Sequence, residues 1–478
     1  MNILDLASKS VTSIVKHSAN KFNSKHSAAP EIPDAPCIKM KNPASDRFNC
    51  GFSSVTVMPE DLDKKSYWLA GYNIGNKIKG VLDPLTVNAM WLDCCDGNGM
   101  LLVSADLVGL TGYDVRDIRR SLDSFCEKSG CKHIMISCTH THAGVDTVGY
   151  WGMLPKSGKD KNYMLLVKGA IKFACIDAYN KRKIGKLYHG NIRVPEAVND
   201  WREPIFPNDV FTRFRFVPDD GGRETWYLNF SAHPNTLGSK NSMISADYPG
   251  ELRREINKIK ETNVLFSVGA IGAADLGDFA EDKYERMIEG GRFLAHKAFE
   301  IENEVQLMPE IKLVCQPFYL PLSNTVLAFM DVLHVIDSIK YTSDKGLGIA
   351  LLSEMTYMSI GGVEILTQPG EIFTELVYPG GYSTEQTSAT GMGERFNPRT
   401  LAEICNNNNL IIFGVTNDMT GYALPPNDFL LNTTQPYLSR TDDRFGRNHY
   451  HETNSLGPET AHTIAAAFER MVGIFNNG

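Results

Sequence analysis

The stretch IMISCTHTH, residues 134–142, runs from an apolar segment directly into two histidines. Its first half is typical of a buried strand, and side chains along an extended backbone alternate between two faces. An extended backbone therefore places His140 and His142 on the same face, where their imidazoles can converge. Neutral imidazole is a common nitrogen ligand of zinc. A surface pair or hydrogen-bonded core histidines would also explain the pattern, so a metal site needs further ligands from elsewhere in the chain.

The segments before this stretch predict a strand–helix–strand unit. Residues 87–92 and 100–107 have the pattern of two strands on either side of a glycine-containing turn. Residues 114–128 have the spacing of a helix that Gly130 ends, and residues 133–138 return as a buried strand. Such units build layered α/β domains, which usually place their sites at strand ends.

The same alternation continues through the rest of the chain. We expect a helix at 162–180, strands at 211–217 and 225–231, a helix at 248–262, a strand at 263–268, and a final helix at 458–475 with Pro458 in its first turn. No internal repeat and no clear break divides these segments. We therefore predict one large layered α/β domain, residues 46–478, with mixed β-sheets flanked by helices and the metal site at strand ends.

Residues 1–45 are predicted to form an N-terminal extension, made of a short helix and a linker. Apolar side chains recur at helical spacing over residues 3–22, and a stretch rich in Ser, Ala and Pro follows. Lys9, Lys16 and Lys21 accompany the helix, which would suit a membrane surface. Packing or fraying of this helix is the simpler interpretation.

Composition excludes several classes of protein. Of the 478 residues, 42% are hydrophobic and 22% are charged, which is usual for a folded globular protein. The net charge of −8 and the lack of a basic stripe argue against nucleic acid as a partner. No apolar run reaches the roughly 18 residues of a membrane span, and no signal peptide is visible, so we expect a cytoplasmic protein without a transmembrane segment. The ten cysteines form no CxxC pair, which favours reduced thiols. The oligomeric state is not indicated.

Three later segments offer partners for the two histidines. NFSAHP at residues 229–234 runs from a strand into His233, where the proline ends the strand. QPGE at residues 368–371 presents Glu371 after a tight Pro-Gly turn. GVTNDMTGY at residues 414–422 is an apolar strand that opens into polar residues. Each segment alone is more often structural than functional.

Together these segments resemble a known family. The matching stretches, in chain order, are SCTHTHAG (137–144), NFSAHP (229–234), SADYPGEL (245–252), QPGEIFTEL (368–376), GVTNDMTGYALP (414–425) and YHETNSLGP (450–458). They resemble the catalytic N-terminal domain of the neutral/alkaline non-lysosomal ceramidases, including shorter bacterial ceramidase-like proteins, from about Cys50 to the last residue. Several motifs in one order are far more specific than any one of them.

The resemblance implies a site with one Zn²⁺ per chain, held by His140, His233, Glu371 and Tyr422. Tyrosine is an uncommon zinc ligand, so Tyr422 is alternatively a catalytic residue that hydrogen-bonds the tetrahedral intermediate. His142 is implied as a catalytic residue that transfers a proton or orients the water.

The activity that the resemblance implies is hydrolysis of a linear N-acyl (amide) bond by a metal-activated water, in sphingolipid metabolism. The substrate would be a small-molecule or lipid N-acyl compound. Two alternatives stay open. One is a catalytically silent, ceramidase-like protein that binds a lipid or another ligand. The other is a zinc hydrolase of a different ester or amide.

Two departures from the family bear on the substrate. The loop at residues 269–277 lacks the serine that ceramidases carry there, and its nearest polar side chain is Asp275, our third candidate catalytic residue. The chain also stops about twenty residues after Gly457-Pro458, so the C-terminal sandwich domain of long family members is not expected. These departures make an N-acyl compound other than ceramide credible.

Four further polar residues are weaker candidates. Asn417 and Asp418 follow the apolar start of the GVTNDMTGY segment, and we expect them to orient the metal-binding histidines through hydrogen bonds. Arg395 and Arg444 would suit a substrate carboxylate, although solvated surface arginines are commoner.

Overall fold

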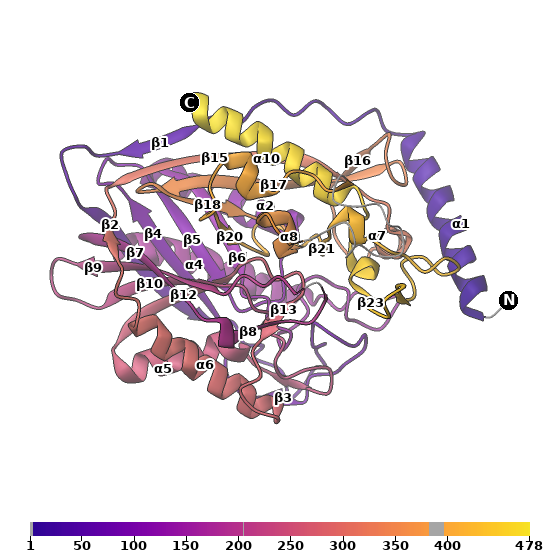
Figure 1. Ribbon diagram of the computed structural model, residues 1–478, viewed down its shortest axis with the longest axis horizontal. Coiled ribbons are helices and arrows are strands. Elements are labelled where there is room, and N and C mark those ends of the chain that lie inside the picture. The colour runs from indigo at the N-terminus through magenta and orange to yellow at the C-terminus, as the bar shows by residue number, and fades with distance from the viewer. Residues whose placement is uncertain (1–2, 204, 382–395) are drawn as a thin grey trace.

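The computed structural model describes residues 3–203, 205–381 and 396–478. Two mixed β-sheets face each other, and helices cover their outer faces, so the chain forms four layers (Figure 1). This arrangement is the large layered α/β domain that the sequence predicts, and layers of this kind bury one core at each of their interfaces.

The larger sheet has nine strands and carries the first part of the site. In spatial order they are β12 (Thr262–Val268), β10 (Glu224–Phe230), β9 (Val210–Pro218), β7 (Lys183–Arg193), β2 (Phe48–Thr56), β4 (Thr86–Asp93), β5 (Gly99–Ala105) and β6 (Cys131–Cys138), and β14 (Val305–Gln306) pairs with β7. The pairs β5/β6 and β10/β12 are parallel, and the other pairs are antiparallel. The predicted strand–helix–strand unit is therefore confirmed between β5 and β6.

The smaller sheet has six strands. They are β1 (Ile38–Lys41), β15 (Glu310–Pro321), β17 (Ile349–Ile360), β18 (Val363–Thr367) and β20 (Ile411–Phe413) in spatial order, and β16 (Lys340–Thr342) pairs with β17. Four two-stranded ribbons complete the strands: β3 (Gly80–Val81) with β11 (Met243–Ile244), β8 (Val198–Asp200) with β13 (Ala274–Leu276), β19 (Glu371–Ile372) with β21 (Tyr422–Ala423), and β22 (Thr441–Asp442) with β23 (Asn448–His449).

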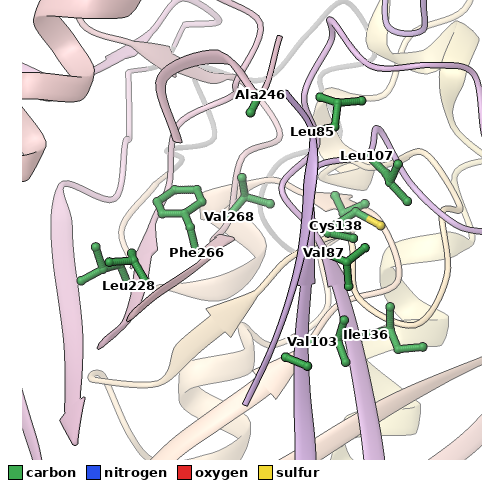
Figure 2. Packing of buried hydrophobic residues seen from close by; sticks show 14 of the residues in the cluster. Leu85, Val87, Val103, Leu107, Ile136, Cys138, Leu228, Ala246, Phe266 and Val268 are labelled. Atoms are coloured by element: carbon green, nitrogen blue, oxygen red, sulfur yellow. The ribbon is translucent and has the colours of Figure 1, made fainter. Parts of the chain in front are cut away.

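Side chains of the central strands alternate between two cores. On β4, Val87 and Trp91 pack under the helices, whereas Met90 packs between the two sheets. This alternation follows from the period of two of an extended chain, and a strand buried on both faces has a nearly continuous apolar sequence. Figure 2 shows the core under the helices, where Val87, Val103 and Ile136 come from three adjacent strands.

Helices cover both outer faces. The larger sheet is covered by α2 (Gly112–Ser121), α3 (Asp123–Ser129), α4 (Lys161–Asn180), α5 (Asp247–Ile259) and α6 (Lys283–Phe299). The smaller sheet is covered by α1 (Ile3–Asn23), α7 (Thr325–Val332), α8 (Thr374–Val377), α9 (Leu401–Cys405) and α10 (Thr460–Asn477). In Figure 1, α10 lies across the smaller sheet, and α5 and α6 lie on the opposite side of the molecule.

Two helix predictions need correction. The single helix expected at 114–128 is two helices, α2 and α3, which meet at Leu122, where the backbone leaves helical geometry (φ −106°, ψ 1°) and the side chain is fully buried. The glycine that ends α3, Gly130, has a φ of 73°, as expected for a helix C-cap. The last helix begins at Thr460, so Pro458 lies in a turn before it and not in its first turn.

The N-terminal extension packs on the smaller sheet. β1 pairs antiparallel with β15, and Val15 and Ala19 of α1 are buried in the core under the smaller sheet. The predicted helix is confirmed, and part of the predicted linker is an edge strand. The domain boundary at residue 45 stays a prediction. Among the described residues, no helix is both long enough and apolar enough to cross a membrane.

Candidate metal centre

Strands of both sheets end at one place, and a predicted ligand follows each end. His140 lies two residues after β6, His233 three residues after β10, and Glu371 four residues after β18. The backbone of residues 414–416 hydrogen-bonds the ends of β6, β12 and β18 over N···O distances of 2.8 to 3.0 Å. The carboxyl ends of strands from both sheets therefore surround one point, where α/β sheets usually bind ligands.

The chain turns at His140. β6 ends at Cys138, and His140 has a left-handed backbone with a φ of 63°. The His140 amide donates to the Leu107 carbonyl and the His142 amide to the Pro234 carbonyl, both at 2.9 Å. The extended backbone that we predicted is therefore wrong here, and the two imidazoles converge because of the turn. Left-handed backbone is uncommon outside glycine and often marks functional sites.

Four donor groups face one another at this point. His142 Nε2 lies 3.1 Å from His140 Nε2. Glu371 Oε2 lies 2.8 Å from His233 Nε2 and 3.3 Å from His140 Nε2. Ring nitrogens of the three histidines all lie within 4.8 Å of one another. His140, His233 and Glu371 are buried and His142 is half-buried, so this compact set of nitrogen and oxygen donors is a candidate metal site.

The donor chemistry fits a divalent cation. His140 Nδ1 lies 2.6 Å from the Val108 carbonyl oxygen, and His233 Nδ1 lies 3.1 Å from that of Ala274. Carbonyl oxygens only accept hydrogen bonds, so each Nδ1 carries a proton and each Nε2 is left to face the carboxylate of Glu371. A metal ion would take the place of a proton between these nitrogens and the carboxylate, in the usual arrangement of metal-binding histidines.

Burial and neighbouring charges set the protonation of the cluster. Burial opposes ionisation of Glu371, but the imidazoles of His140 and His233 outweigh it and hold the pKa of Glu371 well below its ordinary value. Burial lowers the pKa of His142, and the two other histidines lower it further. For His233, burial is outweighed by Glu371, which raises its pKa. Near neutral pH, Glu371 is therefore a carboxylate and His142 a neutral imidazole.

Tyr422 stands beside Glu371. The two residues pair in register between β19 and β21, and the Tyr422 ring centroid lies 6.4 Å from that of His233. Burial and the Glu371 charge raise the pKa of Tyr422 well above its ordinary value, and the neighbouring Tyr450 adds to the rise. The hydroxyl thus keeps its proton. Whether it is a metal ligand or a donor to an intermediate stays a prediction.

Asp275 lies on the far side of His233 from the donor cluster. Its Oδ1 is 3.9 Å from His233 Nδ1 and accepts a hydrogen bond from Asn235 at 2.8 Å. Burial raises the pKa of Asp275, and His233 opposes the rise. This position suits orientation of the His233 ring, because Nδ1 points away from the other donors. The catalytic role that we predict for Asp275 stays a prediction.

Asn417 and Asp418 hold backbone in place, which differs from the prediction. The Ile136 amide donates to Asn417 Oδ1 at 2.9 Å, and the Gly112 amide donates to Asp418 Oδ1 at 2.7 Å. The Ser353 hydroxyl donates to the other carboxylate oxygen of Asp418. No hydrogen bond from either side chain to a cluster histidine occurs within the described part of the chain. Asn417 therefore supports β6, and Asp418 supports the start of α2 and its contact with β17.

Two residues beside the cluster escaped the sequence analysis. Tyr72 packs edge-on against His142, with ring centroids 5.1 Å apart, and its segment carries no motif that would indicate this role. Tyr450 packs edge-on against Tyr422 and belongs to the YHETNSLGP segment, so the resemblance of that segment to the ceramidases could have indicated it.

Of the two candidate arginines, Arg395 lies outside the described residues. Arg444 lies over the Phe445 ring and does not line the cavity described next.

The cluster forms part of the wall of a cavity of about 740 Å³. This volume is in the range of small-molecule sites, roughly 300–1,000 Å³. Apart from the cluster, many of its walls are apolar, and they include Trp151, Leu322, Val326, Phe329, Met330 and Leu351. The cavity therefore joins a polar, metal-binding wall to a chamber that suits hydrocarbon.

A second group of buried metal-binding side chains is a structural network. Asp428, Asp443 and His449 also lie close enough to share an ion. Arg202 bonds Asp428 at 2.7 Å, and Arg447 bonds Asp443 at 2.6 Å. A cation there would meet two guanidinium charges, so we interpret this group as an ion-pair network beneath the site.

The fold and the cluster together define a layered α/β protein with a candidate metal centre at its strand ends. Two solved structures with the same fold are ceramidases. The chain superposes on neutral ceramidase from Pseudomonas aeruginosa with a TM-score of 0.67 and 13% identity, over 92% of this chain and 74% of that chain. A ceramidase complexed with C2 gives a TM-score of 0.68 and 13% identity, over 90% of this chain and 75% of that chain.

The structural likeness confirms the ceramidase-like fold that the motifs predict. Neither a family model nor a curated protein matches the sequence. At 13% identity the likeness establishes the fold alone. The relation to the shorter bacterial ceramidase-like proteins stays a prediction.

A carboxyl group next to the site gives a pH-dependent prediction. Burial raises the pKa of Glu375 from 4.5 to about 8, and the Asp200 carboxylate adds to the rise. Between these pH values the unfolded chain loses a proton that the folded chain keeps. Stability therefore falls by up to about 1.4 kcal/mol per pH unit as the pH rises from about 5 to 8.

Glu375→Gln removes this titration. We expect the substitution to raise the melting temperature clearly at pH 8 and little at pH 5, in thermal scans of both proteins. Glu289→Gln, at an exposed carboxylate paired with Arg292, is the matched control and should change neither value. Equal effects of Glu375→Gln at the two pH values would contradict the raised pKa.

Proposed function

We propose that the chain is a zinc-dependent hydrolase that cleaves an N-acyl (amide) bond, with ceramidase-like chemistry. The observation that carries the proposal is the convergence of three imidazoles and one carboxylate on the wall of a largely apolar cavity. The ceramidase fold supports the reaction class, and the nitrogen and oxygen donors suit zinc.

His140, His233 and Glu371 are the proposed metal ligands, and Tyr422 completes the set or donates to the oxygen that becomes charged. When bound, Zn²⁺ would supply a Lewis acid for the acyl carbonyl and lower the pKa of a water molecule to about 7. His142, neutral and adjacent, accepts the proton of the attacking water and passes it to the leaving nitrogen. The C–N bond breaks, and a carboxylate and an amine are released.

A water nucleophile is consistent with the residues of the cavity. Ser338 is the only serine among the described residues that line it, and its hydroxyl donates to Asp331 at 2.7 Å. No cysteine is among those lining residues. The missing loop serine therefore does not exclude hydrolysis. The apolar walls favour a lipid or another N-acyl compound with a hydrocarbon chain.

Purified, zinc-loaded protein should release fatty acid from at least one N-acyl substrate. The panel contains N-acyl sphingosines, N-acyl ethanolamines, N-acyl amino acids and small acetamides, with matched esters. A zinc chelator should reduce the rate at least about 100-fold, and added Zn²⁺ should restore it, because removal of a Lewis acid costs several kcal/mol of transition-state stabilisation.

Other outcomes decide between the alternatives. Turnover of esters alone would support the metal centre and show that the bond cleaved is an ester and not an amide. Stoichiometric binding without turnover of any substrate would favour the binding protein over the enzyme. Activity that the chelator leaves unchanged would overturn the role of the metal.

A further inference from the structure

The cavity extends from the histidine cluster to the N-terminal helix. Its lining includes His140 and Glu371 of the cluster and also Val11 of α1. Side chains of α7 line it as well: Val326 packs in the apolar group that contains Tyr422, and Leu327 packs in the same core as Val11. The N-terminal segment, which lies outside the stretch that resembles the ceramidases, therefore contributes a wall to the proposed substrate cavity.

One face of α1 forms this wall. Val11, Val15, Ala19 and Phe22 recur at helical spacing and pack with the core under the smaller sheet, where Val15 and Ala19 are buried. Ile14 lies on another face and is 47% exposed. Val11 is only partly buried although it is on the packed face, because the cavity lies beside it.

Polar contacts hold α1 at both ends. Near its start, the Gln435 side chain donates to Asp5 at 2.7 Å. Just after its end, the Thr342 hydroxyl donates to the Ser27 carbonyl at 2.8 Å. A wall fixed at both ends resists displacement by a ligand, so the space beside Val11 limits what the cavity can contain.

We propose that α1 closes the apolar chamber and that Val11 is a residue that determines the length of the acyl chain. The proposal rests on the proposed function, because it assigns the chamber to the acyl group of the N-acyl substrate. The carbonyl lies at the cluster, and the chain runs along α7 towards Val11. Substrates whose chain is too short to reach α1 do not contact Val11.

The test is the acyl-length profile of the full-length protein. kcat/KM is measured for acetyl, hexanoyl, dodecanoyl and hexadecanoyl amides of one amine. Val11→Trp should lower kcat/KM for the longest substrate that the native protein accepts by at least about tenfold, since each methylene kept out of apolar surroundings costs about fourfold in affinity. The acetyl amide should change less than twofold. Val11→Ala should shift the profile towards longer chains.

Ile14→Trp is the matched control, because it adds the same ring to the exposed face of the same helix. Its profile should equal that of the native protein, and thermal scans show whether each variant is folded. Coincident profiles of Val11→Trp and Ile14→Trp would overturn the proposal. A destabilised Val11→Trp is replaced by Leu327→Trp, on the α7 side of the same chamber, for which the same loss is expected.

A binding experiment separates this proposal from the proposed function. Calorimetric titration with straight-chain alcohols of 6 to 16 carbons needs no turnover. Affinity should rise with length up to a limit, and Val11→Trp should move that limit to shorter alcohols. If the native protein hydrolyses no amide but Val11→Trp shortens the longest alcohol that still gains affinity, the proposed function is wrong and the role of α1 as a cavity wall is supported. If Val11→Trp leaves this length unchanged, the role of α1 is wrong, whatever the protein hydrolyses.

Discussion

His140→Ala is expected to lower kcat/KM on the best N-acyl substrate by at least about 1,000-fold, a loss of about 4 kcal/mol of transition-state stabilisation. The imidazole lies 3.1 Å from that of His142 and 3.3 Å from the Glu371 carboxylate, and its other nitrogen is fixed by the Val108 carbonyl. Its removal deletes a proposed metal ligand and leaves Glu371 with one imidazole fewer. The measurements are kinetics and zinc content of the same preparation.

The loss of activity should be accompanied by a loss of bound zinc. His140→Ala should lose most of its zinc together with its activity, while His296→Ala, at an exposed histidine on α6, should keep both. Glu371→Gln should behave like His140→Ala, because a neutral amide is a weaker ligand than a carboxylate. Undiminished hydrolysis by His140→Ala would show that His140 is not a metal ligand required for the reaction.

Arg202→Met is expected to cost about 3–5 kcal/mol of stability, the largest structural effect that we predict. The guanidinium is 3% exposed by residue, and it bonds Asp428 at 2.7 Å and Glu452 at 2.9 Å. It also contacts ring nitrogens of His449 and His451. Removing it leaves the buried Glu452 carboxylate without its guanidinium partner and Asp428 with Arg447 as its remaining one, so the cost of burying these charges is less well compensated.

The Arg202 prediction is checked by thermal and urea unfolding. Arg399→Met, at an exposed arginine that pairs with Glu469, should change stability by no more than about 0.5 kcal/mol. Adding Glu452→Gln to Arg202→Met should recover part of the loss, because it removes one of the carboxylates. Activity should fall too, since His451 stacks against Tyr450 and Tyr422 packs edge-on against His451. A native-like melting temperature for Arg202→Met would contradict this account of the network.

Local sequence pattern predicted the elements of the fold well. The strands around residues 87–107, 131–138 and 210–230 and the helix at 161–180 carry clear periodicity, and the structure confirms them within a few residues. The sequence did not indicate which sheets would face each other, because apolar runs buried on both faces carry no information about their partner. Residues 38–41, predicted as part of a linker, are a strand because they pair with β15, far away in the sequence.

The candidate site was predictable through motifs and not through local geometry. Period-two spacing suggested that His140 and His142 share a face, but the left-handed turn at His140 depends on hydrogen bonds to residues 107 and 234, far away in the sequence. Asn417 and Asp418 were expected beside the histidines, yet they bind backbone amides on neighbouring segments. Arg202 carried no signal, since its carboxylate partners lie more than 220 residues away.

The most direct test of the metal centre is an anomalous difference map of crystals grown with zinc, recorded on both sides of the zinc absorption edge. We expect one strong peak, about 2.0–2.2 Å from Nε2 of His140, Nε2 of His233 and a carboxylate oxygen of Glu371. The same map would show whether the fourth position belongs to Tyr422 or His142. No peak at this cluster, or a peak at Asp428, Asp443 and His449 in its place, would contradict the proposed metal centre.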